Sequence, residues 1–312
     1  MSKYSTEARE LLERQKRDWD WCINGYGSLA TVVTHEFKYD GFSLKVQYNP
    51  GRMTSTSAKV DPKSIKERKC FLCEESLPAA QERLEYKNGY RILVNPFPIF
   101  PEHFTIPNKE HLPQQITGNF EMLLSLAEDL DGKYTVFYNG PKCGASAPDH
   151  FHFQAGTRNF MTVENDFDSL KAKYTVASSS VEGVLLSGID DGIRKMIFIE
   201  GDKIDTTSAE FYKIYEKYKA AMHSDEEPLL NIIAWHDGRM FKVVVFLREK
   251  HRPRRYFAEG EERILLSPAS VDIGGVGVIP VEDDFNRITQ DILTELMTEV
   301  FVSREVLLKV ME

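Results

Sequence analysis

Two histidines and a glutamine alternate with two phenylalanines near the middle of the chain, in the segment His150-Phe151-His152-Phe153-Gln154. Side chains along a β-strand point alternately to its two faces, so a strand here places His150, His152 and Gln154 together and the phenyl rings opposite. Imidazoles in a row suit attack on phosphorus. The alternative is a half-buried structural strand. Because the 312 residues include only eight histidines, we favour chemistry.

A loop of small residues precedes this strand, between Asn139 and Pro148. Such loops can turn their backbone N–H groups toward a phosphate. The loop and the histidine row together predict a site that handles phosphate.

A second cluster of chemistry-bearing residues is the pair Cys70 and Cys73, which have the C-x-x-C spacing. Zinc binds thiolates and imidazoles in tetrahedral sets, so a structural site needs two further ligands. The two remaining cysteines lie far away in sequence, and His111 and His150 are better candidates. A pair of small buried side chains is the alternative. A thioredoxin-like redox role has little support, because no βαβ pattern surrounds the pair.

Composition bounds the class of protein. The net charge is −9 and the pI about 5.5, so no global basic field points to nucleic acid or to an anionic membrane as a partner. Residues 1–17 lack the apolar core of a signal peptide, and no apolar run reaches the length of a membrane span. We therefore expect a soluble, cytoplasmic protein.

An anionic substrate must then be held by local basic residues. Lys250, Arg252 and Arg254 form one basic cluster that could hold an acceptor phosphate, although a solvated basic turn fits it at least as well. Arg52 could also contact phosphate, and a solvated loop arginine is an equal alternative.

The elements that must position these residues alternate along the chain. We expect an N-terminal helix from Ser5 to Trp21, with Trp19 and Trp21 packed on the core, and a closing helix over 285–312. Between them, the patterns predict strands at 31–35, 42–48, 90–94 and 134–138, helices at 120–130 and 208–223, and a hairpin over 229–247. Both halves mix strands with a helix, so a diverged duplication is conceivable.

Three segments, 95–111, 139–154 and 267–280, resemble the nucleotidyltransferase and phosphorylase branch of the histidine-triad (HIT-like) superfamily. That branch includes hexose-1-phosphate uridylyltransferases, diadenosine tetraphosphate phosphorylases and GDP-L-galactose phosphorylase. The resemblance implies an α+β, HIT-like fold with antiparallel sheets, packed helices and two related halves. We expect an N-terminal helix in 1–30, a catalytic half in 31–170 and a second half in 171–312. Two fused halves could replace a dimer, or the unit could form a homodimer.

The resemblance also implies roles for single residues. His152 is expected to attack the α-phosphorus of a nucleotide and to form a covalent nucleotidyl-histidine. Gln154 and the loop from Cys143 to Ala147, which includes Gly144, Ala145 and Ser146, are expected to hold phosphate oxygens, with Asn139 shaping the loop. Asn95 and Phe97 resemble nucleoside-pocket residues. The implied reaction transfers a nucleoside monophosphate from an NDP-sugar or a dinucleoside polyphosphate to phosphate or a sugar phosphate.

The glutamine separates subclasses of the superfamily. Hydrolases carry a third histidine where this chain has Gln154, and a glutamine cannot shuttle a proton to or from water. Transfer to a phosphate-bearing acceptor is therefore favoured; a nucleotide hydrolase and a non-catalytic nucleotide-binding protein are the alternatives.

Some uridylyltransferase relatives bind zinc through residues that correspond to Cys70, Cys73, His111 and His150, whereas other phosphorylase relatives lack the cysteine pair. The chain reads Pro-Asp-His-Phe-His where the uridylyltransferase has Pro-His-Pro-His, which leaves uridylyl chemistry open.

Overall fold

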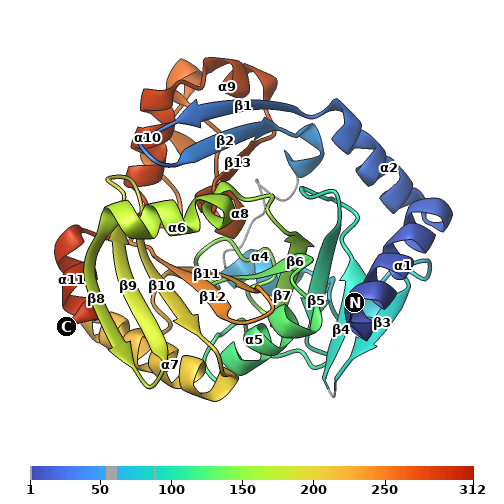
Figure 1. Cartoon of the computed structure of the whole chain (residues 1–312). Helices are drawn as coiled ribbons and strands as arrows, with labels where there is room; N and C mark the ends of the chain where they lie inside the picture. Colours follow the sequence, from blue (N-terminus) through green and yellow to red (C-terminus); the bar gives the residue numbers. More distant parts are fainter. Residues whose placement is uncertain (1, 54–61, 88) are drawn as a thin grey trace.

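Two sheets form the frame of the protein in the computed structural model, which describes residues 2–53, 62–87 and 89–312 (Figure 1). The larger sheet has ten strands, all in antiparallel pairs. In spatial order they are β3 (Arg83–Tyr86), β4 (Tyr90–Val94), β5 (His103–Pro107), β7 (His152–Thr157), β6 (Tyr134–Asn139), β11 (Leu230–His236), β12 (Phe241–Leu247), β10 (Lys195–Gly201), β9 (Val184–Asp190) and β8 (Thr175–Val181). The smaller sheet contains β1 (Val33–Lys38), β2 (Ser43–Tyr48) and β13 (Val276–Ile279), with β13 parallel to β2.

The strand order of the large sheet repeats itself. Five strands of the first half follow the order β3-β4-β5-β7-β6, and five of the second half follow β8-β9-β10-β12-β11 when read from the other edge. Each set has one helix between its third and fourth strands in sequence, α5 (Phe120–Asp129) in the first half and α7 (Ile204–Ala221) in the second. The central strands β6 and β11 pair with each other. The predicted α+β fold with two related halves is confirmed. The domain boundaries at residues 30 and 170 and a homodimer stay predictions.

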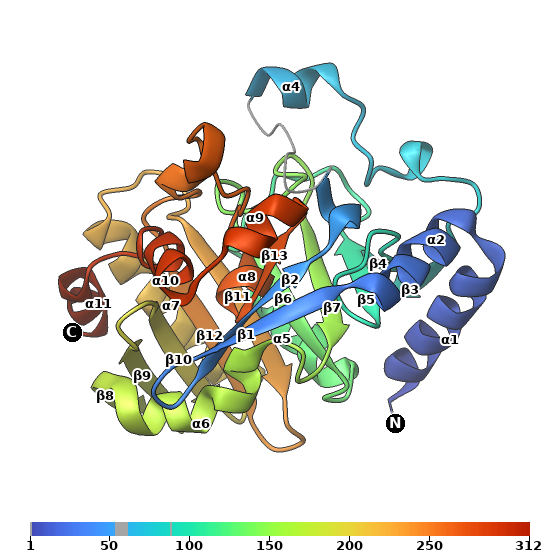
Figure 2. The same ribbon diagram turned by 90° about the horizontal axis from the view of Figure 1, so that it is seen from above.

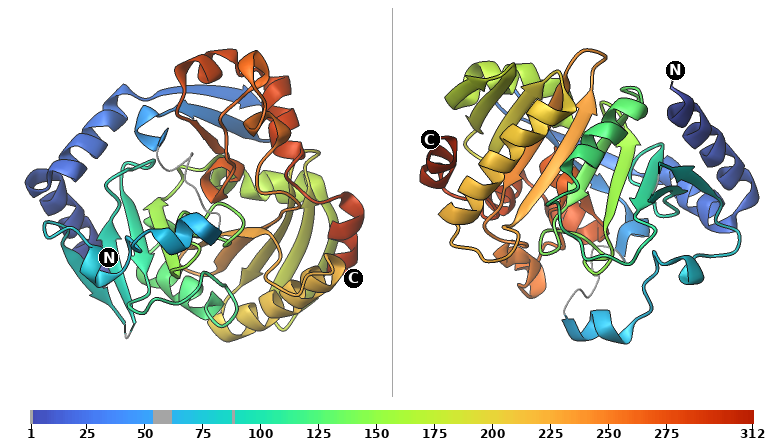
Figure 3. Two further views of the ribbon diagram at one scale, coloured as in Figure 1. Left: turned by 180° about the vertical axis from the view of Figure 1, so that it is seen from behind. Right: turned by 90° about the horizontal axis from the view of Figure 1, so that it is seen from below.

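Helices cover both faces of the large sheet. Figure 3 shows α5 and α7 side by side on one face, and Figure 1 shows α6 (Thr162–Tyr174) and α8 (Ser270–Ile273) between the large sheet and the small one. The other helices are α1 (Lys3–Asp18), α2 (Asp20–Ser28), α4 (Pro62–Glu67), α9 (Glu282–Arg287), α10 (Gln290–Thr298) and α11 (Arg304–Met311). Figure 2 shows α4 extending away from the body of the molecule. None of the helices in the described residues has the length and apolar character needed to cross a membrane.

Alternating residues of the central strands feed two separate cores. In β11, Ile232 and Ala234 belong to the core under α5 and α7, whereas Ile233 and Trp235 belong to the core under α6 and α8. The same period of two in β7 places Phe153 in the first core. His152 and Gln154 therefore face the side of the second core, and in the first half of the molecule this side holds a cavity.

Two predicted helices are interrupted. The N-terminal helix divides into α1 and α2 at Trp19, whose backbone is extended and whose ring is buried. The closing segment is not one helix over 285–312 but α9, α10 and α11. The hydroxyls of Thr289 and Ser303 accept hydrogen bonds from Ile292 N–H and Val306 N–H, so these two residues start new helices as N-caps.

Candidate functional site

A cavity of about 640 Å³ lies over the first half of the large sheet. It is large enough for a nucleotide-sized ligand. The predicted site residues that line it are Asn95, Phe97, Asn139, Gly144, Ala145, Ser146, His152 and Gln154. The structure thus brings together residues from the segment after β4, from β6 and β7, and from the loop before β7, which are up to 59 positions apart in sequence (95 to 154).

The imidazole of His152 is fixed in one tautomer. Its Nδ1 lies 2.8 Å from the carbonyl oxygen of His150, and a carbonyl can only accept, so Nδ1 carries the proton. Nε2 then carries the lone pair. Burial lowers the pKa of His152 to about 4, with a smaller contribution in the opposite direction from the hydrogen bond to His150. At pH 7 the ring is therefore neutral and has a free nucleophilic nitrogen.

The carboxamide of Gln154 is also oriented, by a buried histidine that the sequence analysis did not assign to the site. His103 Nδ1 accepts a hydrogen bond from Ile99 N–H at 3.3 Å, so the neutral ring donates from Nε2 to Gln154 Oε1 at 3.1 Å. Burial, followed by the charge of Arg52, lowers the pKa of His103 to about 3, which keeps the ring neutral. Because Oε1 is engaged, Gln154 presents its NH₂ group to the cavity as a donor for an anion.

The loop before β7 is built around Gly144. Its φ is +97°, and an added Cβ would lie 2.5 Å from Ala269 Cβ, so only glycine fits. Within the described residues, the N–H groups of Gly144 and Ser146 have no hydrogen-bond acceptor. Both residues line the cavity. The loop can therefore donate backbone hydrogen bonds to a bound anion.

Residues of the second half hold this loop in place. Asn139 Oδ1 accepts hydrogen bonds from Asn231 Nδ2 and from the N–H and hydroxyl of Ser270, at 2.7 to 2.9 Å. Asn231 Nδ2 also donates to the carbonyl of Cys143 at 2.7 Å. The predicted role of Asn139 in shaping the loop agrees with these contacts, and Ser270 lies in the 267–280 segment that the resemblance included.

Cys143 is placed differently from the other loop candidates. Its thiol is buried, donates to Asn231 Oδ1 at 3.2 Å, and is not among the side chains that line the cavity. Burial raises the pKa of this thiol to about 11. Cys143 can contribute to the loop through its backbone, whereas its side chain belongs to the packing beneath.

Arginine side chains from distant parts of the chain line the cavity. Arg52 lines it and donates from Nη1 to the carbonyl of Phe97 at 2.6 Å. Of the predicted basic cluster, only Arg252 lines the cavity, whereas Lys250 and Arg254 form ion pairs with Glu299 and Glu295. These cations give a protein of net charge −9 a local site for anions.

An aromatic wall closes the cavity beyond β4. Trp21 and Phe97 are 53% and 46% exposed, and their ring centroids lie 6.1 Å apart. Asn95 shapes the turn before Phe97, because its Oδ1 accepts from Phe97 N–H at 2.9 Å and its Nδ2 donates to Thr105 at 3.2 Å. The expectation that Trp21 packs in the core is wrong. Trp19 is buried as expected, but Trp21 is half-exposed and lines the cavity.

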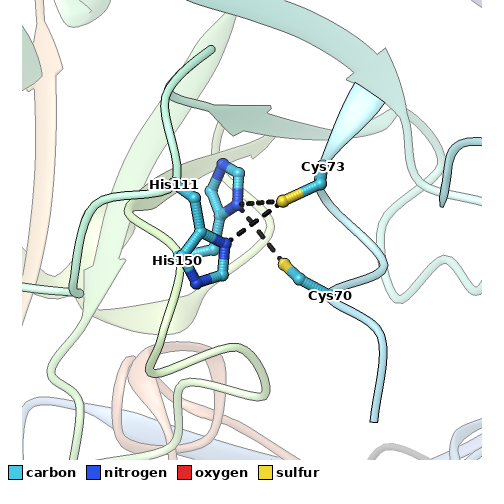
Figure 4. Close-up of side chains that lie close together, drawn as sticks. All are labelled: Cys70, Cys73, His111 and His150. Carbon is cyan, nitrogen blue, oxygen red and sulfur yellow. Dashed lines mark hydrogen bonds between the residues drawn. The ribbon is translucent and has the colours of Figure 1, made fainter. Parts of the chain in front are cut away.

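The four predicted metal ligands lie together next to the start of β7. His150, which the alternation pattern placed in the same strand as His152, instead precedes that strand. Figure 4 shows Cys70 and Cys73 facing His111 and His150, and the four ligand atoms lie within 4.8 Å of one another. The distances from sulfur to the nearest Nδ1 atoms are 3.1 Å for Cys73 to His111 and 3.3 Å for Cys70 to His150. A tetrahedral zinc site has such ligand atoms about 3.4 to 3.8 Å apart, so the cluster could bind a metal after small shifts.

The tautomer of His150 fits metal binding as well. Its Nε2 lies 2.8 Å from the carbonyl of Asn108, so Nε2 carries the proton and the lone pair of Nδ1 faces the two thiols. The hydrogen-bonded backbone carbonyl sets the orientation of the ring, as is common for histidine ligands. His150 and His152 thus belong to different sites. His150 faces the cysteines, whereas His152 lines the cavity.

Comparisons with known proteins agree with this architecture. Residues 11–157, which end with the last residue of β7, match the family described as "Domain of unknown function (DUF4922)". "Protein APA1" of Saccharomyces cerevisiae is 32% identical over 74 residues, which span 21% of this chain and 23% of that protein. The crystal structure of yeast Ap4A phosphorylase Apa2 matches with a TM-score of 0.64 and 15% identity, and covers 96% of this chain and 95% of that one.

The chain has the fold of that phosphorylase. A second structure of the same yeast enzyme, in complex with Ap4A, matches with a TM-score of 0.60 and 14% identity over 96% of this chain and 98% of that one. The expected resemblance to phosphorylases therefore holds for the fold. At this identity the match carries the architecture, and the chemistry must be argued from the site.

Proposed function

We propose that the protein is a nucleotidyltransferase that transfers a nucleoside monophosphate from a dinucleoside polyphosphate to phosphate. The observation that carries this proposal is the neutral, cavity-lining imidazole of His152, whose Nε2 lone pair is left free by the bond between Nδ1 and the His150 carbonyl. A neutral nitrogen nucleophile beside anion donors suits attack on a phosphorus atom.

The reaction proceeds in two displacements. His152 Nε2 attacks the α-phosphorus, the bond from that phosphorus to the bridging oxygen breaks, and the remaining nucleoside polyphosphate leaves with the bond electrons. In the second step a phosphate oxygen attacks the same phosphorus, the P–N bond breaks, and His152 recovers its lone pair while a nucleoside diphosphate leaves. The first step requires no proton donor, because a polyphosphate oxygen leaves as an anion at neutral pH. The second step requires none either, because Nδ1 keeps its proton and the imidazole leaves phosphorus as a neutral ring. A glutamine at position 154 is compatible with this chemistry.

The donors around the cavity suit the charge that develops on phosphorus. Gln154 offers its NH₂ group, and the loop offers the N–H groups of Gly144 and Ser146. These donors are already oriented without a ligand. His103 holds the Gln154 carboxamide, and the hydrogen bonds of Asn139 hold the loop that carries Gly144 and Ser146. Donors that need no reorganisation stabilise a transition state more than the solvated ground state.

Dinucleoside polyphosphate is the favoured donor because the neighbour with the matching fold is named as an Ap4A phosphorylase and binds Ap4A in one of its structures. Trp21, Phe97 and Asn95 form a wall suited to stacking on a nucleobase. An NDP-sugar donor with a hexose 1-phosphate as acceptor or product is the second candidate, since attack by His152 and phosphate binding by Gln154 suit both kinds of donor. In this proposal the metal site is structural. Zinc bound by the two cysteines and two histidines would hold His150 in place just before β7.

Product analysis tests the proposal. The protein is incubated with diadenosine tetraphosphate, GDP-hexoses, ADP-glucose and UDP-glucose, each with and without phosphate, and the nucleotides are separated by chromatography. Phosphate-dependent formation of a nucleoside diphosphate is expected with the first donor. Release of the monophosphate without phosphate would make the protein a hydrolase, and no turnover of any donor would make it a nucleotide-binding protein.

A further inference from the structure

One aromatic side chain of the cavity comes from the cysteine turn itself. Phe71 lies between Cys70 and Cys73, is 46% exposed, and lines the cavity. The next residue, Leu72, is buried, so Leu72 anchors the turn while the Phe71 ring stays accessible. A cysteine turn that only bound a metal would have no need to hold a phenyl ring in a substrate cavity.

Arg68 contacts this ring directly, and Asp149 links Arg68 to the metal cluster. The guanidinium of Arg68 lies 5.2 Å from the Phe71 ring centroid, a cation–π contact. Asp149 holds Arg68 through an ion pair of 2.5 Å, and its other carboxylate oxygen lies 3.8 Å from His111 Nε2. Phe71 is therefore linked to the metal cluster twice, through the chain to both cysteines and through Arg68 and Asp149 to a histidine ligand.

The segments that carry Phe71 and Phe97 are linked to different positions of residues 150–154. Cys70 contacts His150, two residues before His152. The register places Gln154 opposite Thr105, which accepts from Asn95, and Asn95 accepts from Phe97 N–H. The cavity thus contains aromatic rings at Phe97 and Trp21 and a further ring at Phe71, and His152 and Gln154 line it as well.

We infer that Phe71 is the stacking platform for the second nucleobase of the substrate and that the metal cluster holds it there. A dinucleoside polyphosphate carries a base at each end of its phosphate chain. One base stacks on the wall of Trp21 and Phe97, the phosphates lie along His152 and Gln154, and the other base stacks on Phe71. This inference rests on the proposed function and adds to it a residue that distinguishes dinucleotides from mononucleotides.

Equilibrium binding tests the inference without turnover. In a His152→Asn background, the affinities for diadenosine tetraphosphate and for ATP are measured by calorimetry, with and without Phe71→Ala. Stacking on one base corresponds to about a 5- to 150-fold change in affinity, so Phe71→Ala is expected to weaken dinucleotide binding by about that factor and to leave ATP binding within about twofold. Phe71→Tyr should restore the dinucleotide affinity.

The matched control is Phe257→Ala, because Phe257 is 69% exposed and is not among the cavity-lining residues. Zinc content is measured on each variant, and removal of zinc by a chelator should reproduce the loss of dinucleotide affinity, with recovery on adding zinc back. Equal dinucleotide affinity with and without Phe71, or equal loss for both ligands, overturns the inference while the proposed function stands. If the unaltered cavity binds neither nucleotide, the proposed function fails and the inference fails with it.

Discussion

His103 orients the carboxamide of Gln154, and replacing it measures what that orientation contributes to catalysis. His103→Asn keeps an acceptor where Nδ1 receives Ile99 N–H, but the shorter side chain cannot reach Gln154 Oε1. The amide is then free to turn its oxygen toward the phosphate. Loss of one hydrogen bond to a charged group costs about 1.5–3 kcal/mol, which corresponds to about a 10- to 150-fold slower reaction.

The assay is the single-turnover rate of nucleotidyl transfer to His152, with excess protein over diadenosine tetraphosphate. The matched control is His103→Gln, whose amide nitrogen can replace Nε2 as the donor to Gln154. The control should retain most of the rate, and thermal unfolding of both variants shows whether the buried site remains folded. If His103→Asn reacts within about threefold of the unaltered protein, the carboxamide orientation does not contribute as argued here.

Three further predictions follow from the site. Gln154→His introduces a group that can move a proton to or from water, so the ratio of nucleoside monophosphate to diphosphate among the products should rise; an unchanged ratio contradicts the role given to the glutamine. Cys73→Ser should lower both the zinc content, measured by mass spectrometry, and the melting temperature; full zinc retention would exclude Cys73 as a ligand. Buried His103 and His152 stay neutral in the folded protein, with pKa values lowered to about 3 and about 4, while the unfolded chain binds protons near pH 6.5. Stability should therefore be full above about pH 6.5 and fall as the pH drops toward 4, by at most about 2.7 kcal/mol per pH unit from these two groups; urea unfolding that is unchanged between pH 7 and 5 would contradict this.

The parts of the site that are local in sequence could be predicted, because strand alternation and loop composition follow from a few neighbouring residues. The row of His152 and Gln154, the small-residue loop and the C-x-x-C turn were all visible in this way. The grouping of Cys70 and Cys73 with His111 and His150 followed from the ligands that zinc takes. The family resemblance supported it, since spacing alone does not indicate which segments meet.

Contacts between distant segments could not be predicted. His103 and Gln154 are 51 positions apart, and Asn139 and Ser270 are 131 apart. The partners depend on strand order and register, which a single sequence does not specify. Trp21 illustrates another limit, because an aromatic residue in an amphipathic helix predicts burial equally well whether the neighbouring surface is a core or a cavity. Because the helix breaks at Trp19, Trp19 is buried in the core whereas Trp21 lines the cavity.

The central claim is that His152 carries the nucleotidyl group between donor and acceptor. Its most direct test is the intact mass of the protein after incubation with diadenosine tetraphosphate in the absence of phosphate, at neutral pH because a P–N bond is acid-labile. A gain of one adenosine monophosphate is predicted, located on the peptide that contains His152, absent in His152→Asn, and lost on addition of phosphate. Turnover without any adduct, or an adduct on another residue, would contradict the account.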